Sequence, residues 1–425
     1  MISDKLYTLA FEYKRTKLWK KLSDTEMFAV RLPEDRIGYI SVMGMAGGHC
    51  ALGLYIGEEG LNSFRRMAKA DWAAMNPFTF QEQFLQQNCL QCVFLGKDEL
   101  SEEEKAGVKE YARSHGIRIA GKNAYPQFVR YQPGYYPWHI EEEREQEELC
   151  EALKAAIAMA GLLEERKPEE LNLLAVGDNT REIPLLERQG ETYHLGKAEL
   201  PEVKPVSWPQ PKTCNEIGIA NLKKIKRVGI WECGIVQFPE PVQNKRNEAP
   251  VFPLVLLVAE TESKYMLPIS PVIHYEENSE ELLNLMIESF LREEFCPMEI
   301  RVRDARTYAF VKIFCDKLKI KLSMEQELPV LSEVEYEFFR HFSMTEEEEL
   351  REMLDTLGDA LKTGEVELGQ LPDELVEQLG VLMQQGALPK EIEERIEEIF
   401  HFEEKSGARL KKSDFKTVKG KLDLP

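Results

Sequence analysis

The strongest constraint on the fold is the order of strand-like and helix-like segments in residues 227–322. Three apolar segments come first, and the middle one, 251–260, is apolar at almost every position, as in a central strand. A helix is predicted from Asn278, followed by a strand that ends at Asp304, a helix over 308–318 and a short strand. Alternation of this kind predicts an α/β domain.

Prolines predict one sheet edge and one domain boundary. The third apolar segment, 264–275, contains Pro268 and Pro271, which have no N–H to donate to a sheet, so we expect an edge strand there. Residues 200–212 contain four prolines, and a segment of that composition is typically a stiff, extended linker. We therefore expect a boundary between domains at this linker.

The pattern of helical and strand-like segments in residues 1–165 predicts a mixed α+β domain. Residues 3–21 have the apolar spacing of an amphipathic helix, and 141–163 form a second, longer helical segment. Between them lie several strand-like segments and a capping box from Ser101 to Glu104, which should begin another helix. Short strands are expected at 171–177, 183–188 and 191–196.

The C-terminal part of the chain is predicted to be helical and strongly acidic. Residues 345–405 contain nineteen acidic and five basic side chains, a net charge of −14, and an apolar stripe that includes Leu350 and Leu354. Residues 406–425 have six basic and two acidic side chains, a net charge of +4. The predicted organisation is an N-terminal domain, a segment of short strands and linker, an α/β domain and an acidic helical region with a basic tail, at 1–165, 166–215, 216–335 and 336–425.

Charge and hydropathy exclude several classes of protein. The chain of 425 residues has a net charge of −21, which disfavours nucleic-acid binding, because that requires clustered Lys and Arg. The longest apolar run, 251–259, is too short to cross a membrane and is broken by Pro253. Charged residues near the N-terminus interrupt any apolar signal-peptide core. We therefore expect a cytoplasmic protein.

Cys89 and Cys92 are the only two of the eight cysteines that lie close together in the sequence. They belong to a strand-like segment, where an offset of three residues puts the two side chains on opposite faces. A metal site would also require a second pair or spaced histidines, and neither is present. We therefore predict two buried, reduced thiols, with redox or metal chemistry as the weaker alternative.

Two other segments allow both a structural and a functional interpretation. The glycine-rich loop 44–49 lacks the Lys-Ser/Thr of a phosphate-binding loop and joins strand to strand, so a hairpin is the favoured interpretation. The aromatic segment 125–138 could line a ligand pocket or stack on bases. Packing against the 141–163 helix or the second domain is favoured.

Three segments of the first 165 residues, LWKKLSDTEMFAVRL, IGYISVMGMAGGHCALGLYIG and YPQFVRYQPGYYPW, resemble a bacterial family known only as a domain of unknown function. Residues 251–268 and 298–322 resemble a second such domain, which often follows the first. The resemblance implies a recurrent two-domain architecture and assigns no activity.

The strand and helix order in 227–322 is also similar to the ribonuclease H-like fold of integrases and transposases, which have one acid in the first strand and one at the end of the fourth. Here Glu232 lies in the first segment and Asp304 ends the fourth, and period-two alternation predicts that Asp304 shares the inward face of Ile300 and Val302. If the two strands are parallel neighbours, Glu232 and Asp304 could converge.

Convergence of these two acids would allow metal chemistry. Phosphoryl-transfer nucleases hold two divalent ions between bridging carboxylates, and oxygen ligands suit Mg²⁺ or Mn²⁺. Nothing in the sequence selects a third acid among Glu281, Glu288, Glu333 and Glu337. The favoured interpretation is that this fold has no catalytic site. In that case Glu232 pairs with a base and Asp304 caps the following helix.

The sequence leaves the function unknown. The favoured hypothesis is a non-enzymatic cytoplasmic binding or protein-interaction protein with no cofactor, whose protein partner contacts the acidic helical region. The alternative is a metal-dependent phosphodiesterase or nuclease of ribonuclease H-like type, with Glu232 and Asp304 as ligands of Mg²⁺ or Mn²⁺. Binding of a small molecule in a cleft between the two domains is a third possibility.

Overall fold

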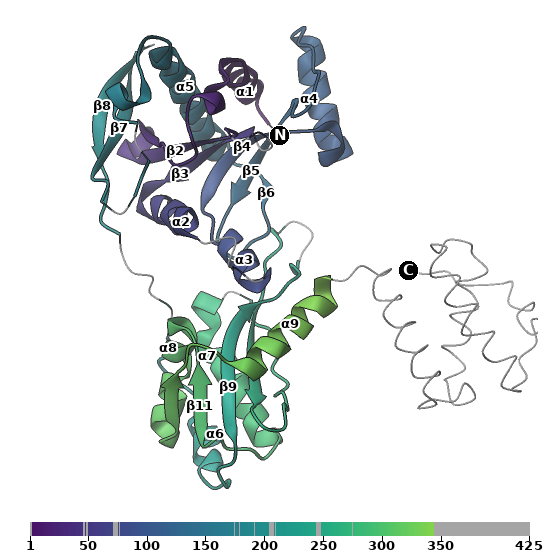
Figure 1. Ribbon diagram of the computed structural model, residues 1–425. Helices are drawn as coiled ribbons and strands as arrows, with labels where there is room; N and C mark the ends of the chain where they lie inside the picture. The colour runs from purple at the N-terminus through teal and green to yellow at the C-terminus, as the bar shows by residue number, and fades with distance from the viewer. Residues whose placement is uncertain are drawn as a thin grey trace, which may run out of the picture. The chain divides into compact units, whose positions relative to one another are not determined.

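The computed structural model describes residues 2–343, apart from 46, 48–49, 71–74, 76, 174, 178, 191, 204–207, 209, 244–247 and 274. It has the predicted α/β class, with two mixed sheets inside one compact unit, Met1–Tyr336 (Figure 1). The acidic region 345–405, the basic tail 406–425 and the helices predicted in them lie outside the described residues.

The first sheet has eight strands in the order β6-β5-β4-β3-β2-β1-β7-β8. The strands are β1 (Phe28–Arg31), β2 (Ile37–Met43), β3 (Cys50–Ile56), β4 (Cys89–Leu95), β5 (Tyr125–Tyr131), β6 (Trp138–His139), β7 (Glu182–Gln189) and β8 (Thr192–Glu199). All neighbours are antiparallel except β1 and β7, which are parallel. The β7–β8 hairpin therefore extends the N-terminal sheet, while the domain boundaries themselves stay predictions.

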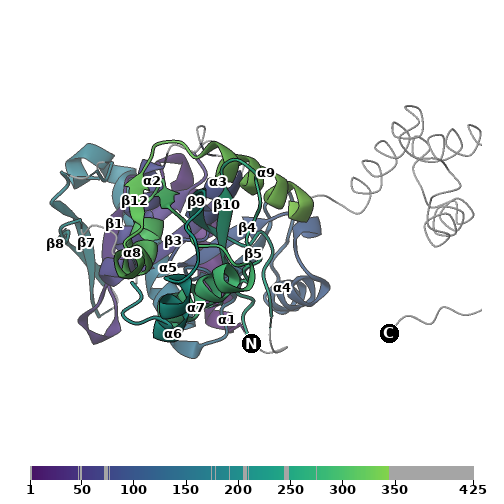
Figure 2. The ribbon, with the colours of Figure 1, turned by 90° about the horizontal axis from the view of Figure 1, so that it is seen from below.

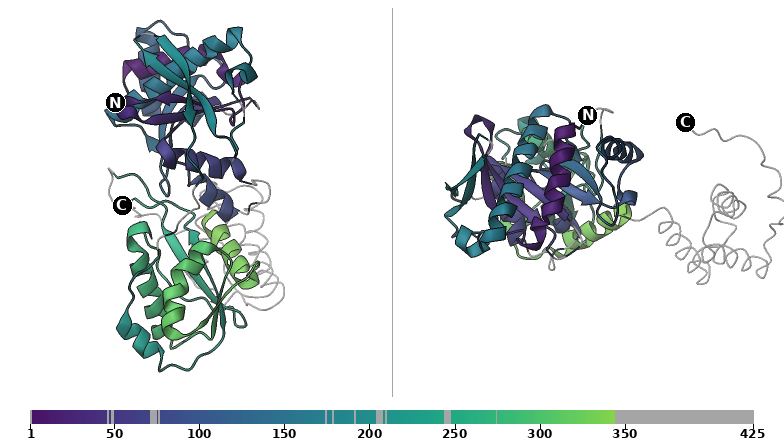
Figure 3. Two further views of the ribbon diagram at one scale, coloured as in Figure 1. Left: turned by 90° about the vertical axis from the view of Figure 1, so that its left-hand side faces the viewer. Right: turned by 90° about the horizontal axis from the view of Figure 1, so that it is seen from above.

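Helices cover both faces of the first sheet. The helices of this part are α1 (Asp4–Thr16), α2 (Gly57–Lys69), α3 (Pro77–Phe84), α4 (Glu102–Ser114) and α5 (Glu143–Glu165). One core lies between the sheet and α1, α4 and α5, and α1 and α5 run side by side over it (Figure 3). A second core lies under α2 on the opposite face. The predicted capping box begins α4: the Ser101 N–H donates to Glu104 at 2.8 Å, and the Glu104 N–H donates to Ser101 Oγ at 3.3 Å.

The two close cysteines lie on opposite faces of β4, as their spacing predicts. Cys92 belongs to the core under α1 and α5, whereas Cys89 belongs to the core under α2. Burial raises the pKa of the Cys89 thiol to about 12 and that of Cys92 well above its ordinary value. Both are free thiols that stay protonated at neutral pH, which does not favour redox or metal chemistry.

The glycine-rich loop joins two antiparallel neighbours, β2 and β3, so the hairpin interpretation is confirmed. Met43 and Ala51 face each other where the loop begins and ends. Gly44 and Gly47 have φ values of 137° and 79°, a region that favours glycine. Conformation therefore accounts for both glycines.

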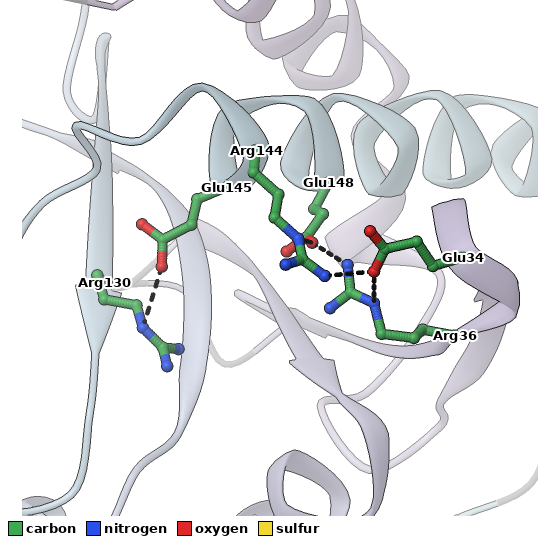
Figure 4. A network of polar contacts seen from close by, with 6 residues as sticks. All are labelled: Glu34, Arg36, Arg130, Arg144, Glu145 and Glu148. Atoms are coloured by element: carbon green, nitrogen blue, oxygen red, sulfur yellow. Dashed lines mark hydrogen bonds and ion pairs between the residues drawn. The ribbon is translucent and has the colours of Figure 1, made fainter.

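A network of ion pairs fixes the N-terminal end of α5 to the first sheet (Figure 4). Glu148 has only 4% of its side chain exposed and accepts hydrogen bonds from Arg36 and, at 3.1 Å, from Nε of Arg144. Arg144 also donates to Glu34 at 2.6 Å, and Arg130 pairs with Glu145 at 3.3 Å. Glu148 is therefore a buried charge compensated by two arginines that are more exposed.

Arg36 and Arg144 should contribute unequally to the stability of the protein. Arg36 is 30% exposed and Arg144 is 56% exposed, so Arg36 supplies more of the desolvated contact to Glu148. We expect Arg36→Met to lower the free energy of unfolding by about 2 kcal/mol and Arg144→Met by less than about 1 kcal/mol. Urea denaturation of the two matched variants measures the difference, and equal losses would contradict it.

The second sheet has four strands in the order β10-β9-β11-β12. β9 and β10 are antiparallel, whereas β11 is parallel to both of its neighbours, β9 and β12. Its strands and helices are β9 (Ile230–Gln237), β10 (Leu254–Glu260), β11 (Glu299–Val302), β12 (Lys321–Met324), α6 (Glu216–Leu222), α7 (Tyr275–Arg292), α8 (Ala305–Leu318) and α9 (Pro329–Ser343). The parallel pairing of β9 with β11 agrees with the ribonuclease H-like resemblance.

Three of the predicted segments differ from the structure in kind or in where they begin. Segment 264–275 forms no continuous strand: Met266 and Val272 make isolated antiparallel bridges to β10, because the two prolines between them cannot donate to the sheet. Of the described residues in 171–177, only Ala175 makes a bridge. Helix α7 begins at Tyr275 rather than at Asn278, where the backbone is locally non-helical.

Helices pack on both faces of the second sheet. Trp231, Cys233 and Ile235 alternate toward a core shared with α6, α7 and α8, and Trp231 is fully buried. The other face is covered by α9, and Figure 2 shows α7 and α9 on opposite sides of β9 and β10. At Gly234 the two layers approach closely: a Cβ there would lie 2.7 Å from a methyl group of Leu331 on α9 and would displace that side chain.

Candidate functional site

Glu232 lies in the middle of β9, on the face covered by α9. It is 3% exposed, and its Oε2 accepts a hydrogen bond from the N–H of Leu331 at 2.7 Å. Leu331 is in the first turn of α9, where N–H groups have no partner within the helix. Glu232 therefore satisfies the amino-terminal end of α9. It also lies opposite Arg301 of β11 in the sheet, so its pairing with a base, as expected in the non-catalytic interpretation, stays a prediction.

Asp304 follows β11 and caps α8. Its Oδ1 accepts from the Thr307 N–H and its Oδ2 from the Thr307 hydroxyl, both at 2.8 Å. The Thr307 hydroxyl in turn accepts from the N–H of Ile235 at 3.2 Å, which fixes the cap against β9. The helix-cap interpretation is confirmed, whereas β11 ends at Val302, so the strand alternation does not extend to Asp304 and its predicted inward face stays a prediction.

Glu335 is a buried acid of this region that the sequence did not indicate. It lies on α9, is 2% exposed and accepts a hydrogen bond from a guanidinium N–H of Arg303. Its Oε2 has no partner among the described residues. Burial raises its pKa, the nearby Asp304 and Glu82 raise it further, and Arg303 lowers it. Its position, one helical turn after the buried Leu331, is the signal that could have identified it.

Arg306 lies beside this group and is 6% exposed. One of its Nη atoms lies 2.7 Å from a carboxylate oxygen of Glu82 on α3, and the other donates to the Ile235 carbonyl at 2.6 Å. Its guanidinium carbon lies 4.9 Å from the ring centroid of Trp208. Arg306 thus joins α3, β9 and the linker. We call Glu82, Arg303, Asp304, Arg306 and Glu335 the carboxyl-end cluster, since it lies where β9 and β11 end.

The four acids considered as a third ligand are all exposed, and none belongs to this cluster. Glu333 pairs with Lys264 at 2.6 Å, and Glu337 pairs with Arg340 at 2.7 Å. Glu281 and Glu288 lie on the solvent side of α7. Among the described residues, no group of three His, Cys, Asp or Glu side chains is arranged to hold a metal ion. The metal site at Glu232 and Asp304 stays a prediction.

The aromatic segment packs on the second part of the chain, which confirms the favoured interpretation. Tyr135 pairs with Val251 in an isolated antiparallel bridge, and the Tyr136 N–H donates to the Pro250 carbonyl at 2.8 Å. The Tyr136 ring stacks on Phe252 with centroids 6.3 Å apart. These contacts join the end of the first sheet to the segment before β10.

Two family models match the chain. Residues 4–176 match the family described as Domain of unknown function (DUF7309), and residues 218–339 match Domain of unknown function (DUF6930). These two matches confirm the resemblance to two domains of unknown function that follow one another. No curated protein matches the chain. In the part of the chain that is described, every helix is too short or too polar to cross a membrane.

Among solved structures, the chain is similar to one described as "Structure of the HTLV-2 integrase catalytic core domain in complex with magnesium (trimeric form)". The identity is 13%, the TM-score is 0.20, and the match covers 34% of this chain and 77% of that chain. A similarity this low says nothing about the activity of the present protein.

Proposed function

We propose that the chain is a non-enzymatic binding protein in which the ribonuclease H-like part serves as a scaffold. The observation that carries the proposal is the contact between Arg303 and Glu335. A metal-dependent phosphodiesterase needs carboxylates that are free to bridge divalent cations. Here a guanidinium already occupies the position beside the most buried carboxylate of the carboxyl-end cluster.

The other acids support the same proposal. Asp304 uses both oxygens to cap α8, Glu232 holds the first turn of α9, and Glu82 pairs with Arg306. A cation bound here would have to break these contacts next to two fixed positive charges, and like charges in a partly desolvated site repel strongly.

The partner that we propose is a protein with a basic surface, bound through the acidic segment 345–405. The net charge of −14 in this segment would attract such a surface and speed its association. The same charge would repel nucleic acid. This proposal requires no cofactor, and we place the protein in the cytoplasm.

The alternative is a metal-dependent phosphodiesterase with Glu232 and Asp304 as ligands. The observation that favours it is the parallel pairing of β9 with β11, in which Glu232 faces Arg301 just before the strand reaches Asp304. Mg²⁺ or Mn²⁺ would be its cofactor, since carboxylate oxygens suit these ions.

Cleavage of labelled single- and double-stranded oligonucleotides in Mn²⁺ distinguishes the two functions. We expect the full chain and the Asp304→Asn variant to give the same background, because no bound metal activates water. Asparagine can still cap α8, so the variant should fold. Manganese-dependent cleavage that the wild type shows and Asp304→Asn lacks would overturn the proposal.

A further inference from the structure

A pocket opens beside Arg306, between the end of the first sheet and the start of the second. Its lining includes Tyr135, Trp208, Gln237, Val272, Tyr275 and Arg306. Backbone hydrogen bonds hold its walls: the Phe252 N–H donates to the Gly134 carbonyl at 2.8 Å, and the Gly134 N–H donates to the Leu85 carbonyl at 3.0 Å. The pocket is therefore preformed and is a structured site for a small molecule.

The charge in the pocket comes from Arg306, the only charged residue of its lining in the described part of the chain. Its guanidinium is held by Glu82, by the Ile235 carbonyl and by the Trp208 ring, so its orientation is fixed. A guanidinium has five N–H donors, and the contacts with Glu82 and the Ile235 carbonyl use one N–H of each Nη, which leaves a second N–H on each of these atoms. Donors of a buried cation thus remain available for an acceptor in the pocket, and carboxylate is the acceptor that guanidinium binds best.

The rest of the lining is apolar or aromatic, apart from two carboxamides. Val272 is 5% exposed, Tyr275 is 2% exposed, and the carboxamide of Gln237 donates to the Phe252 carbonyl at 3.2 Å. The space open to the centres of water molecules in the pocket is about 50 Å³, which is room for about three to five waters. The ligand must therefore combine one acceptor group with a small apolar body no larger than a single ring.

From this combination we propose that the pocket binds a small aromatic or branched-chain carboxylate, with its carboxylate against Arg306 and its apolar part between Val272 and the aromatic rings. The inference rests on the proposed binding function, because it names the ligand class of a non-catalytic site. It also explains why residues of the protein accept hydrogen bonds from only some of the N–H donors of the buried Arg306.

Benzoate is the probe, benzamide its neutral counterpart and acetate the carboxylate without an apolar body. We expect benzoate to bind the full chain at least about tenfold more tightly than either, because only benzoate offers both the charge and the ring. The indole N–H signal of Trp208, assigned with Trp208→Phe, should shift on titration with benzoate. No shift up to about 10 mM benzoate, or equal binding of benzoate and benzamide, would overturn the inference.

Val272→Phe tests the location by filling the pocket while leaving Arg306 in place. The matched control is Val203→Phe, the same change at an exposed valine. We expect benzoate affinity to fall more than about tenfold in Val272→Phe and to stay unchanged in Val203→Phe. Unchanged benzoate affinity in a folded Val272→Phe variant would overturn the location of the site. If that variant does not fold, the shift of the Trp208 indole signal with benzoate tests the location instead. Cleavage lost in Asp304→Asn would overturn the proposed function and leave benzoate binding unaffected, so the two failures are distinguishable.

Discussion

Replacing Arg303 with methionine should destabilise the protein by about 3 kcal/mol. The change removes the cation that compensates Glu335, which is 2% exposed and has one oxygen without a partner among the described residues. An uncompensated buried carboxylate typically costs this much. Urea denaturation monitored by tryptophan fluorescence measures the loss.

The pH dependence of this loss should identify Glu335 as its source. Burial already raises the folded-state pKa of Glu335 above its unfolded value, and without Arg303 that pKa rises further. A group with a raised pKa contributes stability below its unfolded pKa, near 4.5, and loses that contribution as the pH rises through the folded pKa. The free energy of unfolding of Arg303→Met should therefore be closest to that of the wild type near pH 4.5, and the difference should be largest at neutral pH.

The control for this prediction is the double variant Arg303→Met with Glu335→Leu. Replacing both partners by apolar side chains removes the buried charge, so most of the lost stability and its additional pH dependence should return. A loss in Arg303→Met that the second substitution leaves unchanged would show that the buried charge is not its cause.

Replacing Arg306 with methionine should cost about 2–3 kcal/mol and loosen α3. The change removes the contacts with Glu82 and the Ile235 carbonyl, and leaves a buried carbonyl with one partner fewer. Because Glu82 lies on α3, amide hydrogen exchange in that helix should also accelerate. Denaturation and hydrogen-exchange mass spectrometry measure the two effects.

Lys312→Met is the matched control, since it also removes a basic side chain from α8. Lys312 is 51% exposed and pairs with Asp316 at 2.7 Å, so its loss should leave the free energy of unfolding nearly unchanged. Equal effects of the two substitutions, or an unchanged exchange rate in α3 of Arg306→Met, would contradict the role given to Arg306.

The sequence predicts those parts of the fold that local patterns determine. Period-two alternation places Cys89 and Cys92 on opposite faces of β4, and the capping box of Ser101 and Glu104 locates the start of α4. Long-range pairing has no such local signal. The sequence predicts β7 and β8 only as a separate pair of short strands, whereas in the structure β7 pairs with β1 in parallel.

The candidate site is harder to predict, because its contacts join segments far apart in the sequence. Asp304 is identified in both interpretations, since a cap and a ligand need the same residue type after a strand. Glu335 is missed because its burial depends on α9 packing over the second sheet. Arg306 is missed because its partners come from α3, β9 and the linker.

The central claim is that an arginine, rather than a metal ion, compensates the buried acid where β9 and β11 end. The most direct measurement is anomalous diffraction from crystals of the full chain soaked in Mn²⁺. The account predicts the Arg303 guanidinium beside Glu335 and no manganese peak between Glu335 and Asp304. A manganese ion bound by these two carboxylates, with Arg303 displaced, would contradict it.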